Sequence, residues 1–286
     1  MKIAVVTDST AYLTPQQIRE NDIYIVPIPV ILDGEVYDEG IDITTEEFYA
    51  KLRQSTSFPS TSQPSIGKLM ELYGSLAAKG YDTVISIHLA STISGLTKTI
   101  SAVAKEMHDI NVICFDSRIT VMLMGNLCIQ AARMAKANKS ATEIIAELEA
   151  LRQTIDEYFI VDDLQNLVRG GRLSNASAFI GTVLKIKPIL TFDDTDQIVA
   201  FDKVRSSKRA LKRVEDLFAQ KTQNIDYPLR LIIIHANDSK AAEAWKEELA
   251  QKYPDYPIDI SYFGPVIGTH LGEKALALGW IRDIDK

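Results

Sequence analysis

Two hydroxyl-rich segments and one late histidine carry the side chains of this chain that are best suited to hold an anion. Residues 60–65 read Ser-Thr-Ser-Gln-Pro-Ser, and residues 91–95 read Ser-Thr-Ile-Ser-Gly. Near the end, residues 264–272 place His270 in what reads as a glycine-rich turn. Glycines let the backbone approach a ligand closely, and a histidine can donate a hydrogen bond to an anion near neutral pH. Together these segments predict a pocket for a small acidic head group.

Strand-like and helix-like segments alternate through the first half of the chain, and this order predicts where those side chains lie. Short apolar runs predict strands at residues 2–6, 23–32 (broken at its prolines), 83–87 and 111–115. The spacing of apolar residues predicts helices at residues 15–20, 46–52, 66–78, 95–107, 121–137 and 141–158. Strand, loop and helix in this order indicate parallel βαβ units. Ligands of such sheets bind beyond the carboxyl ends of the strands, so Asp8, Ser94 and Asp116 point to one shared crevice.

The second half of the chain does not continue the regular alternation of strands and helices, and we place a domain boundary between residues 158 and 159. We expect strands at residues 159–161, 189–192, 198–204, 229–235 and 258–263. We expect helices starting at Asp163 and spanning residues 178–185, 207–220, 240–251 and 273–278. The predicted fold class is α/β, with a parallel-sheet N-terminal domain at residues 1–158 and a mixed α/β or α+β C-terminal domain at residues 159–286.

Composition excludes several classes of function. The chain has 286 residues, 46% of them hydrophobic, and a formal net charge of −7. A protein with this charge is not suited to follow a nucleic-acid backbone. The two cysteines, Cys114 and Cys128, lie in apolar patterns and read as core thiols, which fits a reducing cytoplasm. We recognise neither a targeting segment nor a membrane span, and therefore expect a cytoplasmic protein.

Each candidate residue also has a purely structural interpretation. Asp8 and Ser9 can form a turn that caps the next helix, and the serines of residues 60–65 can cap theirs. Asp116-Ser117 is expected to act as a helix cap. His88 and His235 end predicted strands and are expected to be structural. The Gly170-Gly171-Arg172 segment suits a phosphate or an acidic partner as well as a plain turn.

Spacings typical of metal sites and of common catalytic motifs are not found in the sequence. We therefore assign no catalytic residue, no metal ligand and no cofactor. A hydrolase built from Ser94, His270 and Asp8, or a phosphotransfer protein acting on a small anion, stays open as the alternative.

The order and spacing of several short motifs resemble those of the DegV family, the fatty-acid-binding proteins that serve bacterial fatty acid kinase. The resemblance covers nearly the whole chain. The matching segments are Thr7-Asp8-Ser9-Thr10, Thr61-Ser62-Gln63-Pro64, Ile93-Ser94-Gly95, Phe115-Asp116-Ser117, Gly170-Gly171-Arg172, Lys185-Ile186-Lys187-Pro188, Val204-Arg205 and Gly264-Pro265-Val266 with His270 and Gly272.

This resemblance implies two α/β domains with one acyl chain in a tunnel between them. It implies a long-chain fatty acid of the palmitate, stearate or oleate class as the bound ligand. It also implies that a fatty acid kinase, the expected protein partner, phosphorylates the carboxylate that this protein presents. Transient contact with a membrane during lipid exchange is compatible with such a carrier.

The resemblance also assigns roles to residues. It implies that Thr61, Ser94 and His270 hold the carboxylate, and we add the neighbouring Ser62. Arg172 and Arg205 match arginines on the kinase-facing side of the family. We further expect pocket-lining or supporting roles for Asp8, Ser9, Ile93, Gly95 and Gly268.

Overall fold

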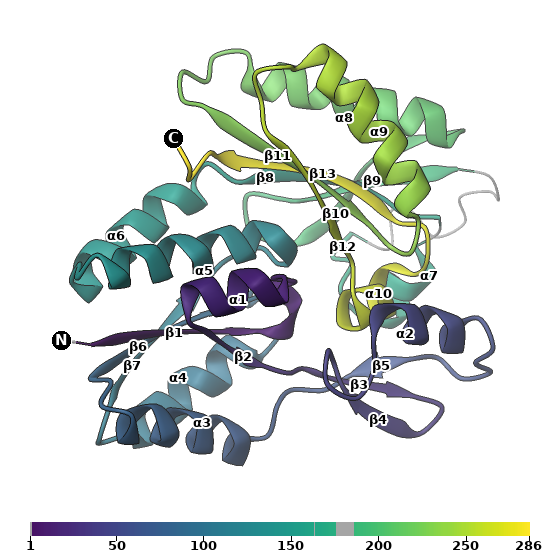
Figure 1. Cartoon of the computed structure of the whole chain (residues 1–286). Coiled ribbons are helices and arrows are strands. Elements are labelled where there is room, and N and C mark those ends of the chain that lie inside the picture. Colours follow the sequence, from purple (N-terminus) through teal and green to yellow (C-terminus); the bar gives the residue numbers. More distant parts are fainter. Residues whose placement is uncertain (1, 163, 176–185) are drawn as a thin grey trace. The chain divides into compact units, whose positions relative to one another are not determined.

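The computed structural model describes residues 2–162, 164–175 and 186–286, and the chain divides into two units (Figure 1). Unit 1 comprises Met1–Thr44 and Gln54–Thr154, and unit 2 comprises Thr45–Arg53 and Ile155–Lys286. The chain therefore enters unit 2 for one short segment, returns to unit 1, and enters unit 2 again. The domain boundary expected after residue 158 stays a prediction.

A four-stranded parallel sheet organises unit 1. Its strands, in spatial order, are β2 (Ile23–Val26), β1 (Ile3–Asp8), β6 (Thr83–His88) and β7 (Asn111–Asp116). The central strands β1 and β6 are rich in valine and isoleucine and almost wholly buried, as expected for a parallel sheet covered on both faces. Because all four strands run in the same direction, their carboxyl ends meet at one edge of the sheet.

Helices cover both faces of this sheet. Helices α1 and α5 lie on one face and α3 and α4 on the other (Figure 1). The helical segments of unit 1 are η1 (Ser9–Ala11, a 3-10 turn), α1 (Pro15–Asn21), α3 (Ile66–Ala78), α4 (Leu96–Glu106), α5 (Val121–Lys136) and α6 (Ala141–Arg152). Sequence signals set several starts: Thr14 and Ser140 form capping boxes, and Ser65 accepts a hydrogen bond from the Lys68 amide.

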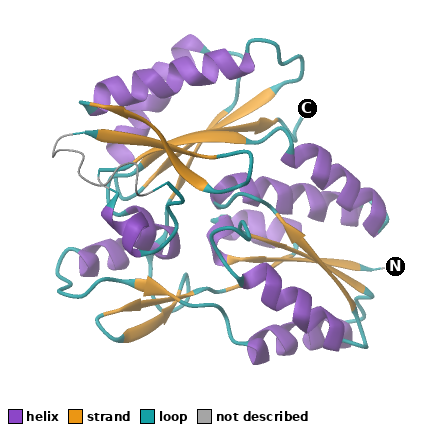
Figure 2. Cartoon of the chain, turned by 180° about the vertical axis from the view of Figure 1, so that it is seen from behind, coloured by secondary structure: helices purple, strands orange, loops and turns teal. Residues whose placement is uncertain are grey.

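A small antiparallel sheet in unit 1 lies to one side of the parallel sheet (Figure 2). Its order is β4 (Glu35–Asp38), β3 (Pro29–Leu32), β5 (Ser60–Thr61). Asp33 and Gly34 both have positive φ between β3 and β4, which is the backbone of a tight hairpin turn. Strand β5 carries Thr61, so this sheet fixes the first of the two hydroxyl-rich segments.

Unit 2 is built on a six-stranded mixed sheet. In spatial order its strands are β10 (Ile198–Val204), β9 (Lys187–Phe192), β8 (Asp156–Ile160), β13 (Leu276–Arg282), β11 (Leu229–His235) and β12 (Ile258–Tyr262). Among its described residues the helices are α2 (Thr45–Leu52), α7 (Gln165–Arg169), α8 (Ser207–Thr222), α9 (Ser239–Lys252) and α10 (Pro265–Leu271). Helices α8 and α9 pack on one face of the sheet, where Phe218, Trp245 and Trp280 are buried (Figure 1).

Two helix predictions are wrong: one helix ends earlier than expected, and the other is not formed. The helix expected at residues 141–158 ends at Arg152, and residues 156–158 belong to strand β8. The helix expected at residues 273–278 is also wrong: residues 273–275 precede β13, and residues 276–278 are its first three residues. In both places the apolar spacing suits a helix, but hydrogen bonding within the sheet favours a strand. Strand β13 pairs with β8 on one side and with β11 on the other. The expected helix at residues 178–185, and the start expected at Asp163, lie outside the described residues.

The fold class is confirmed: unit 1 has a parallel sheet, and unit 2 has a mixed one. Cys114 and Cys128 are unpaired, and burial raises the pKa of Cys128 to about 12, as expected for a core thiol. Within the described part of the chain, every helix is too short or too polar to cross a membrane.

Candidate functional site

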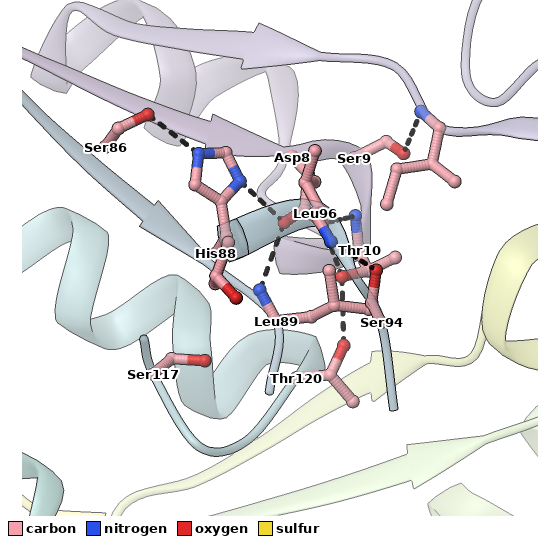
Figure 3. Close-up of polar contacts among 12 residues, drawn as sticks. Asp8, Ser9, Thr10, Ser86, His88, Leu89, Ser94, Leu96, Ser117 and Thr120 are labelled. Atoms are coloured by element: carbon pink, nitrogen blue, oxygen red, sulfur yellow. Dashed lines mark hydrogen bonds and ion pairs between the residues drawn. The ribbon is translucent and has the colours of Figure 1, made fainter. Parts of the chain in front are cut away.

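A buried carboxylate lies at the carboxyl end of the central strand β1 (Figure 3). The Asp8 side chain has no exposed surface. Its Oδ1 accepts hydrogen bonds from the Thr10 amide (3.0 Å) and hydroxyl (2.6 Å). Its Oδ2 accepts from the Leu89 amide (3.1 Å) and lies 3.0 Å from His88 Nδ1. Asp8 therefore caps the 3-10 turn η1 and also binds the end of the neighbouring strand, whereas α1, the helix predicted next, is capped by Thr14.

The segment that carries Ser94 is fixed by its backbone amides. We call residues 89–95 the 89–95 loop. Besides the Leu89 amide on Asp8, the Ala90 amide donates to the Ile119 carbonyl (2.8 Å) and the Ser91 amide to Asp116 Oδ1 (3.2 Å). Three successive amides are thus held by segments at the ends of β1 and β7. Asp8 and Asp116 therefore hold the same loop, and the crevice expected at these strand ends stays a prediction.

Ser94 itself lies at the start of helix α4. Its hydroxyl accepts a hydrogen bond from the Leu96 amide (3.2 Å), and the residue is half-buried. Gly95 is the N-cap of α4 and has no side chain of its own to cap the helix. The half-buried Ile93 donates its amide to the Ala90 carbonyl (3.1 Å), which keeps the loop compact.

Gln63 ties the two hydroxyl-rich segments together, and we did not predict this role. Its Oε1 accepts a hydrogen bond from the Thr99 hydroxyl of α4 (2.6 Å). A Cβ at Gly95 would lie 2.6 Å from Gln63 Nε2, so a side chain at residue 95 would displace the amide. The absence of a side chain at Gly95 lets the Gln63 amide come close, and this glycine after Ser94 was the available signal.

The remaining unit 1 candidates differ in exposure. Thr61 is half-buried in β5, where it pairs with Val30. Ser62 is exposed, and its amide donates to the Pro29 carbonyl (3.0 Å). Ser9 is half-buried, and its hydroxyl accepts from the Ile28 amide (3.1 Å). Ser9 thus supports the turn after β2, while Thr61 and Ser62 lie within three residues of Gln63.

His270 lies on a helix and not in the glycine-rich turn that we expected. Residues Pro265–Leu271 form α10, with proline at the first turn and Gly272 at positive φ after its end. The glycines serve packing. A Cβ at Gly268 would meet the Tyr49 hydroxyl and would lie 3.1 Å from Phe48, both on α2. Tyr49 in turn donates to the Phe263 carbonyl (2.8 Å), so α2 holds the start of α10.

The imidazole of His270 packs against the Gly170-Gly171-Arg172 segment. A Cβ at Gly170 would lie 2.6 Å from His270 Nδ1, so only glycine leaves room for the ring there. Burial, together with the nearby Arg172 guanidinium, lowers the pKa of His270 to about 4. The ring is therefore neutral at physiological pH and offers one N–H donor.

The two arginines expected to face a partner lie in different surroundings. Arg172 is half-buried, donates to the Gly170 carbonyl, and lies close enough to His270 to influence its charge. Arg205 is exposed, in the short link between β10 and α8. The partner-facing role of both stays a prediction, and Arg172 also belongs to the surroundings of the histidine.

One structural expectation at the strand ends is wrong. Asp116 and Ser117 do not cap α5, whose N-cap is Thr120. Asp116 instead accepts from the Ser91 and Arg118 amides, and the buried Ser117 hydroxyl donates to the Ile119 carbonyl. These bonds shape a turn before the helix, which the strand-then-serine pattern could not distinguish from a cap.

The predicted carboxylate ligands are thus divided between the units: Thr61, Ser62 and Ser94 in unit 1, and His270 in unit 2. Within unit 1 the structure brings the two hydroxyl segments together through Gln63. Within unit 2 it brings together His270, Gly170 and Arg172. Their convergence on one carboxylate stays a prediction.

The low pKa of His270 has a measurable consequence. In ligand-free protein we expect its NMR titration to show a neutral ring down to about pH 5, since its pKa is about 4. Arg172→Gln should raise that pKa but leave it below the ordinary value of about 6.5, because burial is the larger cause. In the unfolded chain His270 would take up a proton near pH 6.5, whereas in the folded protein it stays unprotonated until about pH 4. His270 should therefore lower the free energy of unfolding as the pH falls from 6.5 towards 4. A wild-type midpoint near 6.5 would contradict this account.

Comparison with known proteins supplies the family. The sequence profile of the DegV family, a family of uncharacterised proteins, matches residues 2–283. A DegV domain-containing protein of Listeria innocua is 47% identical over 98% of both chains. Protein DegV of Bacillus subtilis is 45% identical over 98% of this chain and 99% of its own.

Solved structures agree with this match. The crystal structure of DegV from Bacillus subtilis, a fatty acid binding protein, has a TM-score of 0.91 with 44% identity, over 99% of this chain and 100% of that one. A fatty acid binding DegV family protein from Streptococcus agalactiae has a TM-score of 0.91 with 36% identity, over 99% of each chain. With the profile matching almost from end to end and relatives this similar in sequence and fold, the chain belongs to the DegV family.

Proposed function

We propose that this protein binds one long-chain fatty acid and presents its carboxylate to a fatty acid kinase. The observation that carries the first part is the similarity, over almost the whole chain, to the fatty acid binding DegV of Bacillus subtilis. We assign the carboxylate to Thr61, Ser94 and His270, with Ser62 beside them. The acyl chain would be of the palmitate, stearate or oleate class.

The local chemistry of each unit supports an anionic head group. Unit 1 offers hydroxyls on two segments that hydrogen bonds hold in place. These bonds are made by the Gln63 side chain and by three backbone amides of the 89–95 loop. Unit 2 offers a neutral imidazole N–H next to the Arg172 guanidinium. A carboxylate loses much hydration when it is buried, and hydrogen-bond donors must replace that hydration. Two hydroxyls, an imidazole and a nearby cation are suited to do so.

The acyl tail would provide most of the binding free energy. Burial of one methylene contributes about 0.8 kcal/mol, so a sixteen-carbon chain could gain on the order of 10 kcal/mol. The head-group site then needs only to offset the cost of burying the charge and to fix which end of the lipid is presented. Such a carrier has no need of a base or nucleophile of its own.

The geometry of unit 1 disfavours the hydrolase alternative. A triad of Ser94, His270 and Asp8 needs the Asp8 carboxylate to orient the histidine. Asp8 instead directs its oxygens at four donors within unit 1: the Thr10 amide and hydroxyl, the Leu89 amide and the His88 ring. The phosphotransfer alternative is an outcome of the ligand test below.

The second part of the proposal requires that a kinase can contact the bound carboxylate. A kinase must contact a carboxylate that a carrier otherwise shields, so we place its docking face at Arg172 and Arg205. Arg205 is exposed and can contact another protein. Two unpaired cysteines are compatible with function in the cytoplasm, beside such a kinase.

The ligand itself is the first test. Protein purified from bacteria, then denatured and extracted, should release close to one equivalent of a long-chain fatty acid. Chromatography and mass spectrometry of the extract would identify the acyl chain. Protein that is empty as purified and does not bind added palmitate or oleate would overturn the proposal. Turnover of esters or small phosphorylated compounds by such empty protein would favour the enzyme alternatives.

The head-group assignment predicts a graded effect of two substitutions. Ser94→Ala should weaken fatty acid binding by about 1.5–3 kcal/mol, the scale of a hydrogen bond to a charged group. Gly170→Ala should push on the His270 ring and weaken binding roughly tenfold, about 1.4 kcal/mol. Gly170 has φ −71°, so alanine there strains no backbone.

Gly74→Ala is the matched control for Gly170→Ala, because a Cβ at Gly74 meets no atom within 4 Å. Affinities would be measured with a fluorescent fatty acid on delipidated protein. Wild-type affinity in both Ser94→Ala and Gly170→Ala would remove these residues from the site.

The docking face predicts a separation of lipid binding from kinase turnover. Arg205→Ala should bind fatty acid like wild type but support slower acyl-phosphate formation by added kinase. The difference from wild type should narrow as salt increases, because screening weakens the steering that Arg205 provides. Lys240→Ala, which removes the same charge from the exposed start of α9, is the control. Equal turnover in Arg205→Ala and wild type at low salt would move the docking face elsewhere.

A further inference from the structure

A chain of four polar side chains runs through the interior of unit 1. Tyr73, Ser86, His88 and Asp8 all have no exposed surface. Tyr73 Oη lies 2.8 Å from Ser86 Oγ, Ser86 Oγ lies 2.7 Å from His88 Nε2, and His88 Nδ1 lies 3.0 Å from Asp8 Oδ2. Figure 3 shows its last three members converging at the ends of β1 and β6.

The position of each proton in this chain follows from Tyr73. Burial raises the pKa of Tyr73, so its phenol keeps the proton. Within residues 2–162, 164–175 and 186–286, Ser86 Oγ is the hydrogen-bond partner of that phenol, so Tyr73 donates to Ser86. The Ser86 hydroxyl must then donate to His88 Nε2, and that nitrogen carries no proton.

His88 is therefore a neutral imidazole with its proton on Nδ1, where it donates to Asp8. A doubly protonated His88 would donate to Ser86, Ser86 would donate to Tyr73, and the buried phenol proton would lose its acceptor. Leaving a buried donor without an acceptor is unfavourable. All donors in the chain thus point towards the single carboxylate.

That carboxylate holds the segment on which Ser94 lies. The His88 N–H is one of four donors to Asp8, and the Leu89 amide, the first of the 89–95 loop, is another. Removing the His88 donor leaves a buried charge with an incomplete set of donors. Water or a shift of the strand end would have to compensate, and either would disturb the neighbouring Leu89 amide.

We propose that His88 is a positioning residue of the head-group site: its neutral imidazole, protonated on Nδ1, completes the donor set of Asp8 and so holds the 89–95 loop and Ser94 in place. This inference rests on the proposed fatty acid site, since it assigns His88 a role through Ser94. It differs from the structural role that a buried histidine at a strand end would have by itself.

The spacing of Ser86, His88 and Asp8 is also that of a nucleophile, a base and an acid. Burial decides against a catalytic role. Ser86 has no exposed surface, and its hydroxyl lies between the Tyr73 phenol and the His88 ring. An acyl substrate has no route to that oxygen without unpacking the interior of the sheet.

Three full-length variants test the proposal through fatty acid affinity and folding stability together. His88→Leu removes the donor to Asp8 and should weaken affinity about tenfold or more, while urea unfolding remains cooperative. His88→Asn can place an amide N–H where Nδ1 lies and should stay within about threefold of wild type. Ser86→Ala breaks the far end of the chain but leaves the Asp8 donors intact, so it should lose stability and keep its affinity.

This pattern separates positioning from stability alone. If affinity followed stability across all three variants, or if folded His88→Leu bound fatty acid like wild type, the proposal would be overturned. Should His88→Leu fail to fold, His88→Asn decides: wild-type-like affinity supports the proposal, and a tenfold loss with a stable fold contradicts it.

Two NMR measurements do not depend on the lipid. The nitrogen spectrum of wild type should show His88 protonated at Nδ1 only, and hydrogen exchange should show a Leu89 amide that is protected in wild type and in Ser86→Ala but less so in a folded His88 variant that lacks the donor. A proton on His88 Nε2, or unchanged Leu89 protection, would overturn the proposal. If wild type binds no fatty acid while both NMR results hold, the proposed function fails and the Asp8–His88 linkage stands.

Discussion

A carboxylate without exposed surface at the end of β1 must be matched by donors, and Asp8 draws them from η1, from the end of β6 and from the loop that follows β6. Each donor segment would otherwise have an unpaired group near the interior, so the charge and the segments satisfy one another. Thr120, at the start of α5, donates to Thr10 and extends the same network to a helix (2.9 Å). The end of β1 is therefore one hydrogen-bonded assembly around the Asp8 carboxylate, and this explains how short loops without regular structure hold definite positions there.

In unit 2 the candidate residue His270 is held by close packing against Gly170, whereas hydrogen bonds to Asp8 hold the loop in unit 1. Around His270 the backbone comes close because glycine occupies the positions where Tyr49 and the imidazole itself need room. The ring is kept neutral by burial and a neighbouring guanidinium, whereas the Asp8 carboxylate in unit 1 is surrounded by donors. A neutral donor beside a permanent cation attracts an anion without itself becoming charged. The two units thus carry different chemistry: hydroxyls on fixed segments in unit 1, and an imidazole with a nearby positive charge in unit 2.

The sequence predicted the parallel sheet and most element bounds, because apolar periodicity, capping residues and turn residues are local signals. The prediction failed where contacts between residues far apart in the sequence determine the structure. Residues 273–278 have the alanine and leucine content of a helix, yet residues 276–278 begin a central strand with a partner on each side. Gln63 was quoted only as part of a motif, since nothing near it in sequence reveals that Thr99 and Gly95 lie against its amide. The neutral state of His270 likewise depends on burial, which a spacing cannot show.

Helix α2 belongs to unit 2 although it is flanked on both sides by unit 1, and this has a consequence for synthesis on the ribosome. Its buried Tyr49 finds its acceptor, the Phe263 carbonyl, 214 residues later in the chain. At about 5–20 residues per second, translation would take roughly 10–40 seconds to supply that partner. During this interval the Phe48 and Tyr49 rings lack the packing against Gly268 of α10 that they have in the folded protein. A nascent chain of this protein therefore offers chaperones a defined apolar target until α10 emerges, and a fragment ending near residue 154 would keep that target permanently.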